Sequence, residues 1–206
     1  MTIEIRKNIS NQGAIMIESY DFKTIDTPAL LVTRPTKAWK ARKIQIIQLF
    51  SPQNTHPMHL THKLLPFHQL NVDELYQLLR LRSEVFVVEQ NCVFLDQDDK
   101  DQQCHHLLLY ADNELAAYSR LVPAGLSYLE PAIGRVVTSP AFRGSGLGRK
   151  VMELAIQGCA DLFGQQTIRI GAQTYALPFY QSLGFVTEGD TYDEDGIEHI
   201  EMIRKF

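Results

Sequence analysis

The sequence predicts a mixed α/β domain built on one sheet, and three patterns support this prediction. An apolar run at residues 133–138 is typical of a strand, and a glycine-rich loop and a helical pattern follow it. A second helix is indicated at residues 71–90, with Asn71 as its N-cap. Two strand-like runs flank the dipeptide Asp112-Asn113, which favours a tight hairpin turn. Two last strands are expected at residues 185–189 and 196–203, and residues 192–195 should connect them. Strands and helices in this alternation are typical of a sheet covered by helices.

Length, charge and cysteine content restrict the class of protein. The chain has 206 residues and a net charge of -4, so it has no overall basic charge that would suit nucleic acid. No apolar run is long enough to cross a membrane, and residues 1–10 lack the apolar stretch of a signal peptide, so we expect a cytoplasmic protein. The three cysteines, Cys92, Cys104 and Cys159, are odd in number and widely spaced. This indicates neither a disulfide framework nor a zinc site.

The first 57 residues differ from the rest in composition. They carry eight Lys or Arg against four Asp or Glu, whereas residues 58–206 carry twelve against twenty. Ile44 and Ile46 could belong to a strand, but no longer period is present. We therefore expect either an accessory N-terminal extension at residues 1–57 or translation from Met58, and mass spectrometry of the native N-terminus would decide between them.

The loop at residues 143–148 predicts an anion site. Pro140 ends the preceding strand, and three alternate glycines let the loop backbone approach a ligand closely. A helix begins at Leu147, and its free amides and positive end favour a diphosphate. The spacing fits neither a Walker loop, because Gly148 is followed by Arg149, nor a dinucleotide fingerprint, which needs two residues between its last two glycines.

Several motifs together resemble the GNAT superfamily of N-acetyltransferases. The loop reads Arg-x-x-Gly-x-Gly, and residues 170–185 contain Phe-Tyr followed by Leu-Gly-Phe. Residues 81–90, 133–136, 171–173 and 195–200 add segments that are similar to the ElaA-like branch. The resemblance covers residues 58–206 and implies a mostly antiparallel mixed sheet, flanked by helices, whose central strands splay apart at an acyl-CoA site.

The resemblance also implies which residues hold acetyl-CoA. Backbone groups of Val136 and Thr138 would pair with the pantetheine amides, and the amides of residues 144–149 would hold the diphosphate. The full set of expected cofactor-binding residues is Val136, Val137, Thr138, Arg143, Gly144, Ser145, Gly146, Leu147, Gly148, Arg149, Gln173 and Tyr180.

Three residues are candidates for the chemical step. The phenol of Tyr180 would lie near the thioester sulfur and could donate a proton to the leaving thiolate, or it could only pack against the cofactor. Glu89, His199 or a water held by Gln173 could be the base, although a solvated Glu89 and a structural His199 are equally open interpretations. No cysteine is placed as a nucleophile, so we expect direct transfer in a ternary complex.

We expect structural roles for the remaining polar residues, except that Arg120 and Arg135 each have two open interpretations. Residues 92–103 read as a flexible acidic loop at the rim of the cleft, without the Gly and Glu of a calcium loop, so we expect no metal. Arg120 and Arg135 stand within apolar strands, where they pair with carboxylates or bind an acidic part of the acceptor. The adjacent His105 and His106 should face opposite sides of the sheet and not share a metal.

The sequence thus predicts an acyl-CoA-dependent N-acyltransferase that transfers acetyl from acetyl-CoA to a primary amine. An inactive acyl-CoA-binding module, or a partner-binding protein that uses residues 1–57, is the alternative. We expect a small-molecule or peptide amine as acceptor, which the acidic charge of residues 58–206 would suit if it is cationic. A homodimer is possible, and neither nucleic acid nor a membrane is expected as a partner.

Overall fold

The computed structural model describes residues 58–206 and two short strands nearer the N-terminus. These strands, β1 (Asn8–Ile9) and β2 (Ile15–Met16), pair antiparallel with each other. The strand suggested at Ile44 and Ile46 lies outside the described residues, and the division of the chain at residue 58 stays a prediction.

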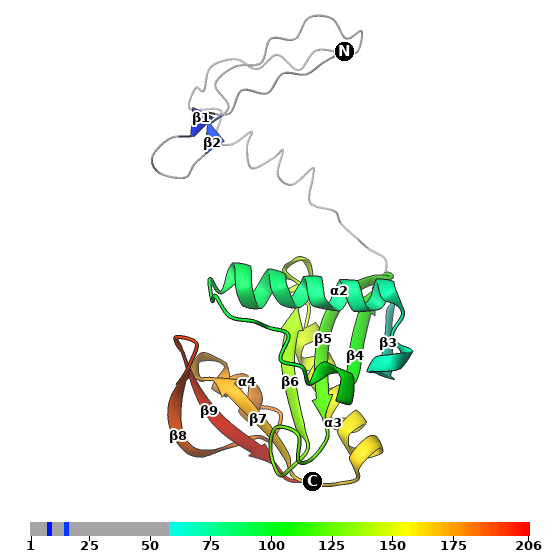
Figure 1. Cartoon of the computed structure of the whole chain (residues 1–206), viewed down its shortest axis with the longest axis vertical. Helices are drawn as coiled ribbons and strands as arrows, with labels where there is room; N and C mark the ends of the chain where they lie inside the picture. Colours follow the sequence, from blue (N-terminus) through cyan, green and yellow to red (C-terminus); the bar gives the residue numbers. More distant parts are fainter. Residues whose placement is uncertain (1–7, 10–14, 17–57) are drawn as a thin grey trace, which may run out of the picture. The chain divides into compact units, whose positions relative to one another are not determined.

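Residues 58–206 contain one seven-stranded sheet with the order β3-β4-β5-β6-β7-β9-β8 (Figure 1). Only the β6–β7 pair is parallel, and every other neighbouring pair is antiparallel. The predicted mixed, mostly antiparallel sheet is therefore confirmed. The strands are β3 (Leu60–Pro66), β4 (His105–Ala111), β5 (Glu114–Val122), β6 (Ala132–Thr138), β7 (Ile168–Gln173), β8 (Val186–Glu194) and β9 (Ile197–Arg204).

The first long helix follows its sequence signals. Helix α2 (Val72–Arg82) begins after Asn71, whose side chain accepts from the Glu74 amide at 2.8 Å while Glu74 accepts from the Asn71 amide at 3.0 Å. This reciprocal capping confirms the predicted start. The helix continues as a wider π turn, η2 (Ser83–Glu89), so the prediction of a helical segment to residue 90 holds with a change of winding.

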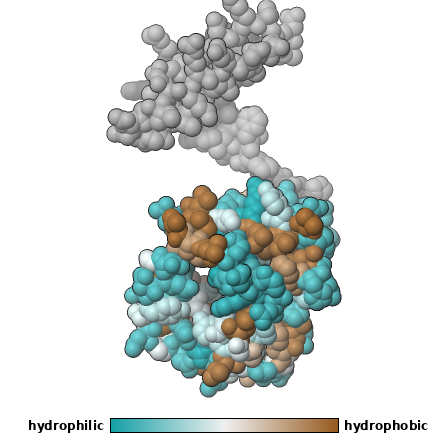
Figure 2. All heavy atoms as spheres, viewed as in Figure 1, coloured by the Kyte–Doolittle hydropathy of each residue, from teal (hydrophilic) through white to brown (hydrophobic). Residues whose placement is uncertain are grey.

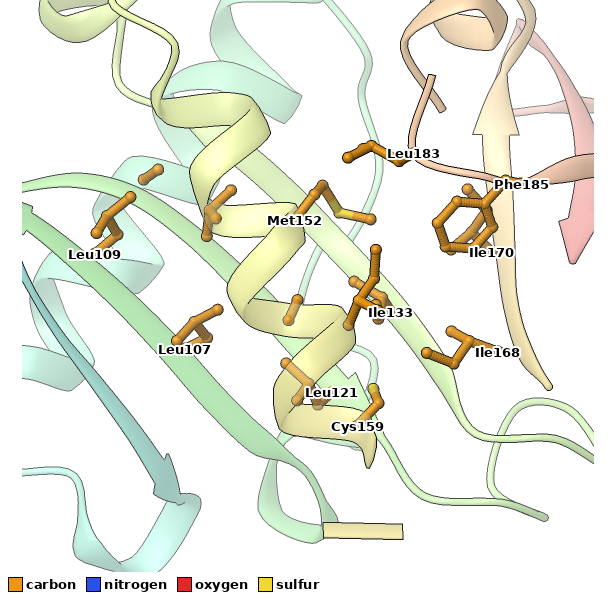
Figure 3. Close-up of a cluster of buried hydrophobic side chains, with 14 of the residues drawn as sticks. Leu107, Leu109, Leu121, Ile133, Met152, Cys159, Ile168, Ile170, Leu183 and Phe185 are labelled. Carbon is orange, nitrogen blue, oxygen red and sulfur yellow. The ribbon is translucent and has the colours of Figure 1, made fainter. Parts of the chain in front are cut away.

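Two helices cover opposite faces of the sheet because alternate strand residues point to opposite sides. Leu108 and Tyr118 pack in a cluster with α2 residues, whereas Leu107 and Leu109 join the larger core around α3 (Leu147–Phe163). Figure 3 shows this core, with Met152 and Cys159 of α3 against side chains from the sheet. The labelled sheet residues are Leu107, Leu109, Leu121, Ile133, Ile168 and Ile170. Cys159 is buried, and its burial raises the pKa of the thiol to about 12.

Both hairpins use turns with left-handed backbone conformations. Asp112 and Asn113 have φ of 49° and 69°, which confirms the predicted turn between β4 and β5. The last hairpin is longer than expected, because β8 continues to Glu194 and the turn is only Asp195-Gly196, with φ of 54° and 82°. The prediction that residues 192–195 connect these strands was wrong, because Asp-Gly is itself a strong two-residue turn signal.

The edge strand β3 was not expected from the sequence, because apolar and polar residues alternate only weakly along it. Among the described residues, no helix is both long and apolar enough to cross a membrane. A short helix, α4 (Leu177–Gln181), follows β7 and carries Tyr180.

Candidate active site

The central strands β6 and β7 separate soon after they meet. Their only paired residues are Ala132 and Arg169, at the beginning of each strand. Beyond that point, the edge of β6 that faces β7 has no strand partner in the described part of the chain. A bulge at Arg135, where φ is 51°, adds one residue to β6 relative to β5. The expected splay of the sheet is thus present.

A cavity of about 890 Å³ opens at this splay. Figure 2 shows a face of the molecule on which hydrophilic and hydrophobic patches meet and whose surface is hollowed. A cavity of this size is adequate for a ligand of cofactor size. The predicted site residues that line it come from six elements or loops, and they are Val136, Val137, Thr138, Arg143, Gln173, Tyr180, Glu89 and His199.

A second cavity, of about 350 Å³, lies at the glycine loop. Gly144 and Gly146 have φ of 78° and 84°, which a side chain at either position would make unfavourable. Thr138 and Arg143 line both cavities, so the two adjoin there. The other residues that line the smaller cavity are Phe142, Gly144, Gly146, Leu147, Gly148, Arg149 and Phe179. Of the predicted cofactor residues, Ser145 lines neither cavity, and its hydroxyl donates to the Phe142 carbonyl.

The N-terminus of α3 has the properties of an anion site. Gly146 occupies the N-cap position and no side chain caps the helix. The first bond within the helix is from the Lys150 amide to the Gly146 carbonyl at 3.1 Å, so the amides before it have no partner along the helix. The first turn contains no acidic residue, but it does contain Arg149. A cation there opposes the helix dipole, whereas a bound anion would stabilise both.

Close packing also requires glycine at position 148. A Cβ added to Gly148 would lie 3.3 Å from Oγ1 of Thr138, so a side chain would press against β6. The next residue, Arg149, donates from its guanidinium to the hydroxyl of Ser182, the residue that follows α4, at 2.6 Å. The loop, the helix and the strand therefore meet closely at the point where the two cavities adjoin.

Tyr180 presents a protonated phenol to the larger cavity. Its ring packs edge-on against Phe179 and Phe185, with centroids 5.1 and 6.1 Å away. Burial, with a smaller effect from Tyr175, raises the pKa of Tyr180 to about 12. The phenol is therefore neutral at physiological pH and can donate a proton.

The two predicted base residues differ in their surroundings. Nδ1 of His199 lies 2.8 Å from the Ile197 carbonyl, which can only accept, so Nδ1 carries the proton and Nε2 is the acceptor. The ring stacks on Tyr192 with centroids 5.8 Å apart. Glu89 is exposed, and its two carboxylate oxygens accept from Arg143 at 2.8 and 2.9 Å. Gln173, proposed to hold a water, donates to Gln90 at 3.4 Å.

Arg120 and Arg135 take the structural role that was one of their two interpretations. Arg120 donates to Asp98 at 2.6 Å and to Asp101 at 2.7 Å, and Arg135 donates to Asp96 at 2.8 Å. These carboxylates belong to the segment predicted as a flexible acidic loop. The segment does border the cavity, but the prediction of a flexible loop was wrong, because Asp96 and Asp101 are buried in ion pairs.

A third arginine completes this network and was not singled out in the sequence. Arg82 of α2 is fully buried and donates to Asp96 at 2.8 Å and to Asp101 at 2.9 Å. Burial alone would raise the pKa of Asp98, but the hydrogen bonds and charges of Arg120 and Arg135 outweigh it and hold that pKa well below its usual range. We call the six residues the buried arginine network: Arg82, Arg120, Arg135, Asp96, Asp98 and Asp101.

No metal site is found in the part of the chain that the structure describes, where no three potential ligands are suitably grouped. His106 bonds the Tyr118 hydroxyl at 2.8 Å and the Asp101 carbonyl at 3.0 Å. His105 packs its ring edge-on against Phe163, on the α3 side of the sheet. The two adjacent histidines thus belong to opposite faces, as the alternation of a strand requires.

Several residues of the larger cavity were missed by sequence reasoning. Tyr128, in the connection between β5 and β6, lines it, as do Glu194 and Asp195 at the tip of the last hairpin. Gly171 of β7 faces the same region, where an added Cβ would lie 2.8 Å from the Tyr192 hydroxyl. Gly171 and Asp195 belong to segments 171–173 and 195–200, which carried the family resemblance, but neither residue was assigned to the site. Tyr128 and Glu194 lie outside these motifs, and only the folded sheet brings them to the cavity.

Comparison with known proteins agrees with this arrangement. The sequence model described as an acetyltransferase (GNAT) domain matches residues 81–206, and the chain belongs to this family. Among individual relatives, protein ElaA of Escherichia coli is 41% identical over 140 residues, which cover 66% of this chain and 91% of ElaA. A UPF0039 protein of Synechocystis is 44% identical over 138 residues, covering 66% of this chain and 90% of that protein.

Solved structures give the same result. The crystal structure of E. coli ElaA has a TM-score of 0.67 and 37% identity, and the match covers 71% of this chain and all of ElaA (100%). An acyl-CoA N-acyltransferase from Pseudomonas aeruginosa also has a TM-score of 0.67, with 39% identity over 71% of this chain and 99% of that one. The resemblance to the ElaA-like branch is confirmed.

Proposed function

We propose that this protein is an acyl-CoA-dependent N-acyltransferase that transfers an acetyl group from acetyl-CoA directly to a primary amine. The observation that carries the proposal is the free edge of β6 at the splay. Thr138 of this strand lines the cavity at the glycine loop and also the larger cavity that Tyr180 borders. A pantetheine arm has amides that can pair with such an edge as an added strand does. The diphosphate would lie on the amides of residues 144–149 at the start of α3.

Each step of the transfer has a candidate group in the cavity. Acetyl-CoA, when bound, supplies the reactive thioester. Nε2 of His199 takes a proton from the incoming ammonium, because Nδ1 is already committed to the Ile197 carbonyl. The neutral phenol of Tyr180 donates a proton to the departing sulfur. Glu89, which also lines the larger cavity, orients the amine.

Calorimetric titration of acetyl-CoA into the full chain tests the binding part of the proposal. We expect micromolar binding that is lost in Gly146→Glu, because the new carboxylate would compete with the diphosphate. Gly146 has φ of 84°, so any side chain adds strain there. Gly146→Asn is the matched control, since Asn tolerates this conformation and carries no charge. Absence of binding to a folded wild-type chain would contradict the proposal.

Replacement of Tyr180 by Phe tests the chemical part. With an amine accepted from a panel, we expect a fall in kcat of about a hundredfold and little change in the Kd of acetyl-CoA, since only the proton donor is removed. Thiol release is the readout. An unchanged kcat would show that Tyr180 only packs against the cofactor. Binding without turnover for any amine would favour the inactive acyl-CoA-binding module.

A further inference from the structure

The pair formed by Arg143 and Glu89 lies at the junction of the two cavities. Arg143 lines both cavities, whereas Glu89 lines only the larger one. Both nitrogens at the end of the guanidinium are committed, with 2.8 and 2.9 Å to the two carboxylate oxygens. We call the larger cavity, where the amine would bind, the acceptor cleft. Arg143, which belongs to the glycine loop, is therefore held by a carboxylate that lines this cleft.

We propose that Glu89 and the diphosphate of coenzyme A compete for Arg143, so that cofactor binding releases the Glu89 carboxylate into the acceptor cleft. The inference rests on the proposed function, because it requires a diphosphate at the glycine loop. It adds to that function a coupling between the two ligands that act at the site.

The exposure of the pair makes the exchange favourable. Both side chains are 44% exposed, and ion pairs of this kind are weak because water solvates both partners. A diphosphate carries more negative charge than one carboxylate, and it presents oxygens that a guanidinium binds in a bidentate manner. The amides at the start of α3 hold the diphosphate at the same time, so Arg143 adds to contacts that Glu89 cannot make.

Release of Glu89 changes the charge of the acceptor cleft. Arg120 and Asp98 remain paired with each other in the buried arginine network. Glu194 and Asp195 also line the cleft, and neither pairs with a cation among the described residues. Lys100 also lines the cleft, and it pairs with no carboxylate among residues 58–206. Once Arg143 is bound to the diphosphate, the freed Glu89 adds a third carboxylate without a partner against this one cation, so the cleft becomes more negative and attracts an ammonium group.

Thermodynamic linkage makes this effect reciprocal. If coenzyme A frees Glu89 for the acceptor cation, the acceptor cation in turn frees Arg143 for coenzyme A. Each ligand then binds more tightly in the presence of the other. An amine acceptor would be held weakly until the cofactor is in place, which favours formation of the ternary complex over non-productive binding.

A double-mutant cycle with coenzyme A as the titrant tests the competition. Glu89→Gln should tighten the Kd of coenzyme A about three- to fivefold, the effect of removing a weak competing pair. Arg143→Gln should weaken it about tenfold. In the Arg143→Gln background, Glu89→Gln should change the Kd by less than about twofold, because the guanidinium for which Glu89 competes is absent.

Glu84→Gln is the matched control. Glu84 lies in η2, five residues before Glu89, is exposed, and pairs with no cation among residues 58–206. The substitution Glu84→Gln removes the same charge without affecting Arg143, so the affinity for coenzyme A should stay within about twofold. Two outcomes would overturn the inference: an equal gain in affinity from Glu84→Gln, or a gain from Glu89→Gln in both the wild-type and the Arg143→Gln backgrounds. Either would show that the change in affinity comes from long-range electrostatic repulsion and not from competition for Arg143.

The outcomes separate the inference from the function on which it rests. No binding of coenzyme A to the wild-type chain would contradict the proposed function. Binding with an additive cycle would contradict only the competition. A structure of the complex gives an independent test, since we expect Arg143 and Glu89 to be more than about 4 Å apart, beyond ion-pair distance. A retained pair beside a bound diphosphate would overturn the inference.

Discussion

Two sets of arginine–carboxylate pairs border the same cleft, and they differ in burial. The buried arginine network joins α2, β5 and β6 to the loop before β4, and Arg82 at its centre is fully buried. The side chains of Arg143 and Glu89, which line the same cleft, are each 44% exposed. The hydrogen-bond lengths are nearly the same in both sets, so distance does not distinguish them.

The comparison teaches that burial decides which pair can respond to a ligand. A buried ion that loses its partner remains in a poorly solvated place, and its loss of stability is large. An exposed ion that loses its partner is solvated by water at little cost. The network can therefore fix the shape of the cleft, whereas the exposed pair is free to exchange partners.

The largest expected effect comes from removal of the central buried arginine. Arg82→Met should lower the free energy of unfolding by about 3 kcal/mol, because Asp96 and Asp101 each lose a partner in a buried site. Arg143→Met, the same replacement in the exposed pair, should change it by less than about 0.5 kcal/mol. Urea unfolding followed by circular dichroism of the full chain measures both.

Equal losses of stability in these two variants would remove the distinction between the two sets. A stable Arg82→Met variant would mean that apolar packing replaces the ion pairs, as it does in some buried networks. In that case the cleft would be shaped by the strands and helices, with no contribution from the arginines.

Acid should weaken the network at a pH set by its carboxylates. The folded-state pKa of Asp98 lies well below that of the unfolded chain, and that of Asp101 is also lowered against the effect of its burial. The stability they contribute is present above about pH 4 and is lost as the pH falls toward their folded-state pKa.

Because these carboxylates are protonated as the pH falls, we expect the free energy of unfolding to decrease by about 2 kcal/mol between about pH 4 and pH 2. Asp98→Asn should lower the stability at neutral pH and make this acid-dependent loss smaller. Glu89→Gln should leave the loss unchanged, and urea unfolding at a series of pH values measures all three. A slope that is identical in Asp98→Asn and the wild-type chain would show that other carboxylates control the acid transition.

The sequence predicted those parts of the fold that depend on local signals. Asn71 and Glu74 mark the start of α2, and glycines bound the helix α3, because capping is decided within a few residues. Arg82, by contrast, looks like an ordinary helix charge in the sequence. Its burial depends on contacts 14 and 19 residues along the chain, which no local pattern contains.

The candidate site also combines features that local patterns predict with a contact between distant residues that they do not. The glycine loop was predicted as an anion site because such a site requires glycines and a helix start at fixed spacing. Tyr180 was expected only from the resemblance to the GNAT proteins, and both border the adjoining cavities. The pair of Arg143 with Glu89 spans 54 residues, and each was expected in the site for a separate reason. Their contact with each other could not be foreseen, because it depends on the end of η2 lying against the glycine loop.

The smallest predicted effect concerns the bulge of β6, where the network meets the cleft. Arg135 has φ of 51°, in the left-handed region, and its guanidinium is held by Asp96 at 2.8 Å. Arg135→Ala and Arg135→Gly both remove this ion pair, but only glycine adopts the left-handed conformation without strain. We expect Arg135→Gly to be about 1 kcal/mol more stable than Arg135→Ala.

The size of this difference shows what the network does for the cleft. If the glycine variant is the more stable and keeps the affinity for coenzyme A, the bulge persists without Arg135, and the ion pair only supports a conformation that the fold already requires. If the two variants are equally stable and both bind coenzyme A weakly, the bulge relaxes when the ion pair is lost. The buried arginine network would then set the separation of β6 from β7, and the exchangeable pair would act on a cleft that the buried one creates.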